Sequence, residues 1–250
     1  MRILTCIRVL LAVTVALIGV TPSHATGVAG QGTWESTLLV RDVGNTGTTN
    51  AFYDAALGVT WLANANVNGL MDWTSANTWA NTLSVNGVGG WRLPTMSAPS
   101  AACDASNIGT NCGYNVATSS SELASLFYNA LGNRAYYDTN GAMQAGPGLT
   151  NTGGFQNLQS YVYWFSTAYA LGNDSAWSFG ANYGGQGPNL KTNPFYAMAV
   201  HPGDVGTVVA SVPEPETYAL LLVGLGLIGA VARRREARTL GFGSLGRSQQ

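Results

Sequence analysis

Two apolar runs near the ends of the chain restrict any water-soluble fold to the residues between them. The first run covers residues 9–20, follows two arginines, and precedes small residues at the −3 and −1 positions of a cut after Ala25. This order predicts a secretory signal peptide over residues 1–25, so the exported chain begins at Thr26. Twelve apolar residues are too few for a membrane anchor, which needs about 20.

The second apolar run, residues 217–232, lies between Pro213-Glu214-Pro215 and Arg233-Arg234-Arg235. In a helix its sixteen residues span about 24 Å, against a bilayer core of about 30 Å. We expect a transmembrane helix with the arginines in the cytoplasm, because basic residues mark that side. Residues 26–212 then lie outside. A buried core helix is the alternative interpretation.

Pro-Glu-Pro, a short apolar span and a basic cluster, in that order, resemble the PEP-CTERM sorting signal of exported bacterial proteins. The resemblance implies export by the general secretion machinery, transient retention in the membrane, and processing near Pro213 by an exosortase-type membrane protease. This chain continues past the basic cluster, where such signals usually end. The predicted organisation is a signal peptide (1–25), an N-terminal segment (26–50), a folded domain (51–206), a linker (207–216), a transmembrane helix with the Arg cluster (217–235) and a cytoplasmic tail (236–250).

The exported region is acidic, although the whole chain has a net charge of only −1. Residues 26–212 contain four basic and nine acidic side chains, a net charge of −5. Such a region does not attract nucleic acid or other anionic polymers by bulk charge. Neutral glycans are still possible ligands, because the region is rich in the aromatic, amide and hydroxyl groups that bind sugars.

Cys103 and Cys112 are the two cysteines of the exported region. In an exported chain, two cysteines in a loop rich in Ser, Asn and Gly are expected to form a disulfide. A zinc site needs more ligands than two thiolates, and no histidine lies nearby in the sequence. We therefore predict a disulfide and neither a metal nor any other cofactor.

Hydrophobic periodicity predicts an α+β domain. One helix is expected to begin at an Asp72 N-cap and to end at Gly87. A second is expected to begin with a capping box of Ser119 and Glu122 and to end at Gly132. Alternating or β-branched runs predict strands, at residues 35–41, 51–54, 59–62, 161–167, 175–179 and 196–201.

Several tryptophan motifs lie within this region. They are Trp73-x-x-Ala76-x-x-Trp79-Ala80, Gly89-Gly90-Trp91-Arg92-Leu93-Pro94-Thr95, Glu122-Leu123, Trp164-Phe165-Ser166-Thr167, Ala176-Trp177 and the segment 199–205. Together they resemble the DUF1566 family, also called the Lcl C-terminal domain, which is similar to C-type-lectin-like folds. The resemblance implies a compact domain of two helices and one curled antiparallel sheet with long loops.

The motif residues have structural roles in our interpretation. Trp91 and Leu93 are expected to be buried strand residues, with Pro94 ending the strand, and Arg92 to hold a carboxylate or loop carbonyls. Core positions are also expected for Trp164 and Trp177. The resemblance carries over no ligand contact. One branch of the family binds sulfated polysaccharides, which the charge of −5 opposes in this chain.

Catalytic patterns are sparse. His201 is the single histidine after Thr26, so a Ser-His-Asp triad depends on it, with Asp204 as its partner, and no nucleophile elbow is present. A surface histidine at a strand end is the favoured interpretation. Asp104, Asn107 and Asn111 offer oxygens for calcium but lack the Asp-x-Asp-x-Asp-Gly loop.

These observations favour a non-catalytic, lectin-like module that recognises glycan or another envelope component. An exported enzyme acting on extracellular polysaccharide and a purely structural matrix protein are the alternatives. The sequence assigns no ligand-binding residue. Whether Trp34, Tyr136, Tyr137, Tyr183 and Tyr196 line one exposed groove or scatter is a question for the structure.

Overall fold

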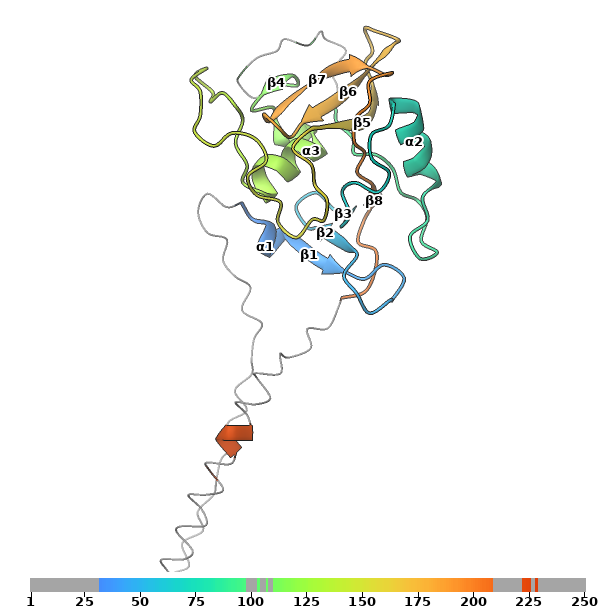
Figure 1. Ribbon diagram of the computed structural model, residues 1–250, viewed down its shortest axis with the longest axis vertical. Helices are drawn as coiled ribbons and strands as arrows, with labels where there is room; N and C mark the ends of the chain where they lie inside the picture. Colours follow the sequence, from blue (N-terminus) through green and yellow to red (C-terminus); the bar gives the residue numbers. More distant parts are fainter. Residues whose placement is uncertain are drawn as a thin grey trace, which may run out of the picture. The chain divides into compact units, whose positions relative to one another are not determined.

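The computed structural model describes residues 32–97, 103, 107, 110–208, 222–225 and 228. The chain divides into two compact units, Met1–Thr207 and Val208–Gln250. The first is mixed α+β, with two antiparallel four-stranded sheets and few helices (Figure 1). In the second, residues 222–225 and 228 are helical. No helix among the described residues is long and apolar enough to cross a membrane.

Several sequence predictions fall outside the described residues. These are the signal peptide with its cut between Ala25 and Thr26, most of the predicted transmembrane helix, the cytoplasmic tail, and the motif residues Pro213, Glu214, Pro215, Arg233, Arg234 and Arg235.

The first sheet has the strand order β1-β2-β3-β8. The predicted hairpin is confirmed, with β2 (Ala51–Asp54) paired to β3 (Val59–Leu62). Strand β8 (Val200–Pro202) pairs with β3 on the far side from β2. The edge strand β1 (Leu38–Arg41) is shorter than predicted. The residues before it form the helical turn α1 (Trp34–Thr37), because the Thr33 carbonyl accepts from the amide of Thr37 at 2.8 Å.

The second sheet has the order β4-β7-β6-β5 and corrects the expectation of one curled sheet. Strands β5 (Val162–Ala168) and β6 (Ser175–Gly180) lie where predicted. The sheet also contains β4 (Gly113–Tyr114) and β7 (Gly185–Leu190), which were not predicted. Strand β7 pairs with β6 at six positions. Its sequence, GQGPNL, has no β-branched or aromatic residue, so backbone pairing with a strong neighbour overrides its weak propensity.

The helix α2 (Trp73–Thr82) begins as predicted, because the Asp72 carboxylate accepts from the Ser75 amide at 2.9 Å. It ends before Gly87, since Leu83 is already extended. The predicted capping box at Ser119 is wrong. Ser121 caps α3 (Glu122–Ala124), which continues as the π-helical turn η2 (Ser125–Ala130), and Ser119 lies in the 3-10 turn η1 (Thr118–Ser120).

The main core lies where α3 and η2 meet both sheets. Leu123, Leu126 and Phe127 from the helix pack in one cluster with residues of both sheets, including Trp61 of β3 and Phe179 of β6. A second cluster joins α2 to β5. Its contacts include a hydrogen bond from the Trp73 indole to the carbonyl of Phe165 at 2.8 Å. Burial of these large apolar side chains is the main source of stability for the first unit.

The C-terminal end of the first unit is fastened to its N-terminal edge strand. Asp42 and Thr207 exchange two backbone hydrogen bonds, of 2.9 and 3.0 Å. Beside them, the Arg41 guanidinium holds both carboxylate oxygens of Asp204, at 2.6 and 2.7 Å. The folded part of the chain therefore closes on itself close to the boundary between the two units.

Asp42 supports the loop after β1 and makes folding stability depend on pH. Its carboxylate accepts from the Thr46 amide at 2.8 Å and the Gly47 amide at 2.6 Å. The Thr46 hydrogen bond, the largest contribution, holds the pKa of Asp42 below its usual value. The stabilisation is present above the unfolded pKa of about 3.9 and is lost as the pH falls through the lower folded pKa.

We therefore expect Asp42→Asn to lower the free energy of unfolding at pH 7 and to matter progressively less below about pH 4. The new amide group places a donor where Asp42 now accepts a backbone hydrogen bond. Urea unfolding of the full chain at pH 7, 5 and 3 measures the effect. Glu35→Gln removes the same charge from an exposed position and is the control. Equal losses for Asp42→Asn at all three pH values contradict the prediction.

Candidate functional site

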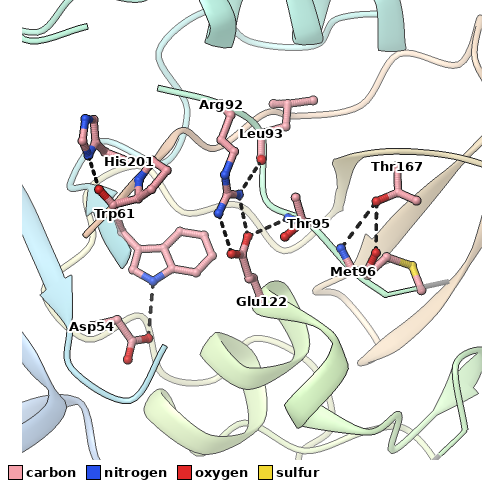
Figure 2. Close-up of polar contacts among 10 residues, drawn as sticks. Asp54, Trp61, Arg92, Leu93, Thr95, Met96, Glu122, Thr167 and His201 are labelled. Carbon is pink, nitrogen blue, oxygen red and sulfur yellow. Dashed lines mark hydrogen bonds and ion pairs between the residues drawn. The ribbon is translucent and has the colours of Figure 1, made fainter. Parts of the chain in front are cut away.

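Arg92 and Glu122 form an ion pair that joins the segment Gly89–Thr95 to the start of α3 (Figure 2). The guanidinium nitrogens Nη1 and Nη2 donate to the two carboxylate oxygens of Glu122 at 2.8 and 2.7 Å. The same carboxylate accepts from the Thr95 amide at 2.6 Å, and Nη1 also reaches the Leu93 carbonyl at 3.0 Å. Arg92 thus binds both a carboxylate and a loop carbonyl, the two kinds of partner expected from the sequence. Each carboxylate oxygen of Glu122 accepts at least one hydrogen bond.

The tryptophan motifs form core rather than a binding surface. Trp91, Trp164 and Trp177 are buried, as predicted, together with Leu93, and Trp73 and Trp79 pack partly buried against the α2 cluster. The motif segments contact one another directly. The Ser166 amide donates to the Pro94 carbonyl at 2.9 Å, and the Thr167 hydroxyl to the Met96 carbonyl at 3.2 Å.

His201 and Asp204 do not form the pair that a catalytic triad needs. The Nδ1 atom of His201 lies 2.6 Å from the Pro202 carbonyl oxygen, and its ring packs edge-on against Trp91 at 5.6 Å between centroids. Asp204 binds Arg41 instead. His201 is partly exposed on β8. The arrangement therefore matches the surface histidine of the favoured interpretation.

Cys103 and Cys112 form the predicted disulfide. The side-chain nitrogen Nδ2 of Asn115 fastens the neighbouring loop by donating to the carbonyls of Asn107 at 2.8 Å and Tyr137 at 2.9 Å. Asp104, the carboxylate of the possible calcium site considered from the sequence, lies outside the described residues. Among the residues that are described, no group of three His, Cys, Asp or Glu side chains is placed to hold a metal ion.

Four tyrosines gather at the end of the second sheet, and we call them the tyrosine surface. They are Tyr114, Tyr136, Tyr137 and Tyr183. The ring of Tyr137 lies 5.2 Å from that of Tyr114 and 4.9 Å from that of Tyr136, and Tyr114 lies 6.0 Å from Tyr183. All these contacts are T-shaped, which is a favoured geometry for aromatic pairs.

The structure brings together three of the five aromatic residues named from the sequence and leaves two elsewhere. Tyr196 contacts Tyr161 and Tyr163, and Trp34 packs against the main core. Tyr114 was not among those five, because β4 is two residues long and gives no periodic signal.

Glycines position the tyrosine surface. The Tyr183 ring covers the backbone of Gly180 and Gly185, where an added Cβ would lie only 2.5 and 2.6 Å from ring atoms. The Tyr136 amide donates to the Tyr183 carbonyl at 2.8 Å, which fastens the loop that carries Tyr136 to the β6–β7 turn. The glycines on both sides of Tyr183 are the sequence signal that could have indicated a ring packed flat on the sheet.

The tyrosine surface is partly open to solvent. Burial raises the pKa of Tyr114 and of Tyr183 above the ordinary tyrosine value. Tyr136 is 38% exposed, and Met143, whose sulfur lies 3.2 Å from the Tyr136 hydroxyl, is 71% exposed. Such a surface offers neutral aromatic and apolar contacts edged by hydroxyl groups.

Comparison with known protein families finds the PEP-CTERM protein-sorting motif at residues 211–235. Such a motif implies export, anchoring in the membrane and processing by an exosortase. It lies in the second unit, so it concerns delivery rather than the folded domain. No curated protein matches the chain.

Proposed function

We propose that this chain is a bacterial surface or matrix protein whose folded domain binds neutral polysaccharide without catalysis, through the tyrosine surface. The gathering of four tyrosine rings at one place, with Tyr136 exposed beside Met143, carries the proposal. Aromatic rings present flat apolar area at little entropic cost, and their hydroxyls remain available for hydrogen bonds. These are the contacts that a sugar chain needs.

The charge of the exported region supports a neutral ligand. Its net charge of −5 repels sulfated or carboxylated polymers at low ionic strength. Tyrosine is uncharged at neutral pH, and burial raises the pKa of Tyr114 and of Tyr183 further from it. We expect binding to persist in high salt, because no charge pairing contributes to it.

The sequence resemblance to the DUF1566 family, and through it to C-type-lectin-like folds, is consistent with a recognition module. The proposal includes a transmembrane helix over residues 217–232 that holds the chain before processing. A non-catalytic role is favoured because Asp204, the partner that His201 needs in a triad, is bound by Arg41.

Tyr136→Ala tests the proposal. We expect it to weaken retention of the full chain by neutral polysaccharides about tenfold, because truncating a central interface aromatic costs more than about 1 kcal/mol. The measurement is affinity electrophoresis of the full chain in gels that contain dextran, mannan or galactan. A detergent without a sugar headgroup avoids competition.

Tyr161→Ala is the matched control. Tyr161 is 42% exposed, close to the 38% of Tyr136, and its ring contacts Phe195 and Tyr196 rather than the tyrosine surface. Retention should be unchanged in this variant. The proposal fails if no neutral polysaccharide retards the wild-type chain, or if the two variants lose retention equally.

A further inference from the structure

The hydroxyl pocket is a polar cavity of about 230 Å³ beside the start of α3. It is lined by Leu57, Met96, Glu122 and six hydroxyl-bearing residues, Thr95, Ser97 and Thr118 to Ser121. None of these residues belongs to the tyrosine surface. We propose that this pocket binds one neutral sugar ring, such as a chain end or a branch.

Among the residues that the structure describes, four of the six hydroxyls make no side-chain hydrogen bond to a protein partner. Ser121 donates to the Gln186 side chain at 2.7 Å, and Ser120 to the Ala117 carbonyl at 3.0 Å. Within the described part of the chain, no side-chain hydrogen bond joins the hydroxyls of Thr95, Thr118 or Ser119 to a protein partner, and the same holds for Ser97. Each hydroxyl can donate one hydrogen bond and accept two, as a sugar hydroxyl does.

The backbone that carries these hydroxyls is fixed before a ligand arrives. Met96 and Ser121 form an antiparallel bridge. The Ser97 amide donates to the Ser120 carbonyl at 2.8 Å, and the Glu122 amide to the Thr95 carbonyl at 3.1 Å. Two chain segments therefore hold their side chains at set positions, and a preorganised site loses less entropy on binding.

The charges at the pocket are already paired. Glu122 is the acidic side chain of the lining, and its two oxygens accept from Arg92 and from the Thr95 amide (Figure 2). A cation would need a carboxylate without such partners, and an anion would need a free guanidinium or ammonium group. Neither is offered by the lining, so hydroxyls and the apolar side chains of Leu57 and Met96 remain to bind a ligand.

The volume limits the ligand to one ring. Pockets for drug-sized ligands measure about 300–1,000 Å³, and the hydroxyl pocket has about 230 Å³. The inference rests on the proposed function for its ligand class, but it concerns separate residues. In this inference the pocket binds one sugar ring, and the tyrosine surface contacts the rest of the polysaccharide.

Binding of monosaccharides by the full chain tests the pocket. The probes are methyl glycosides of glucose, galactose and mannose, with methyl glucuronide and glucosamine as the charged counterparts. We expect saturation-transfer NMR to detect at least one neutral glycoside. Thr95→Val and Ser119→Ala should each weaken its binding about five- to tenfold, the effect of one lost hydrogen bond. Thr82→Val, which removes a hydroxyl from an exposed position on α2, should leave the affinity unchanged.

The outcomes separate this inference from the proposed function. Binding of a neutral glycoside that Thr95→Val or Ser119→Ala weakens, while Tyr136→Ala does not, supports the pocket even if no polysaccharide retards the chain. The pocket is overturned if no neutral glycoside binds, if a charged glycoside binds more tightly, or if both pocket variants bind as the wild type does. Near-UV circular dichroism checks that each variant is folded, and Ser119 is exposed, so its variant stays informative if Thr95→Val unfolds.

Discussion

Replacing Arg92 by methionine will lower the free energy of unfolding by about 3 kcal/mol, because it leaves the Glu122 carboxylate largely buried without its cation. The two side chains are only 25% and 15% exposed, so solvent does little to compensate for the lost partner. A loss of this size corresponds to a fall of roughly 6–12 °C in the melting temperature. Thermal unfolding of the full chain, followed by near-UV circular dichroism, measures it.

A double-mutant cycle isolates the interaction between the two charges. Arg92→Met combined with Glu122→Leu removes the buried charge altogether and should cost less than the sum of the single substitutions. The double variant still leaves the Thr95 amide without its acceptor, so we expect only partial recovery. Additive losses, or a loss below about 1 kcal/mol for Arg92→Met, contradict a strong buried pair.

The second large effect concerns the disulfide between Cys103 and Cys112. Its half-cystines are nine positions apart, and on the chain-entropy account a cross-link of that length stabilises by about 2–3 kcal/mol. Cys103→Ser with Cys112→Ser should lose this amount in urea unfolding. Dithiothreitol should bring the wild type to the same stability and leave the double variant unchanged. Equal stability of wild type and double variant without reductant contradicts the prediction.

The predictable parts of the fold have local signals. Asp72 caps α2 with its own side chain, and the aromatic and β-branched residues of β2 and β3 specify their hairpin. Strand β7 has no such signal, because its pairing with β6 is decided by the backbone of a neighbouring strand. Glu122 shows the competition between local and long-range contacts. The pattern Ser-x-x-Glu predicted a capping box, but Arg92, thirty residues away in sequence, takes the carboxylate.

The candidate site was predictable only in part for the same reason. Tyr136 and Tyr137 are neighbours in sequence, but Tyr114 and Tyr183 reach them through the pairing of β4 with β7 and the turn after β6. Trp34 and Tyr196 are aromatic residues of the same region, but Trp34 packs against the main core and Tyr196 against Tyr161. The hydroxyl pocket needs Ser97 beside Ser120, a contact that composition alone does not indicate.

The fastening of Thr207 to Asp42 has a mechanical consequence for a protein tethered at its C-terminal end. Tension along the tether first loads the two hydrogen bonds of that bridge. It then loads the hydrogen bond from the Val205 amide to the Thr60 hydroxyl, the pair of Arg41 and Asp204, and the hydrogen bonds of Gly203. All of these can separate before β8, which ends at Pro202. Residues 203–207, whose fully extended length is roughly 17 Å, then become part of the tether. The domain can thus lengthen its tether under tension while the strands of both sheets stay paired.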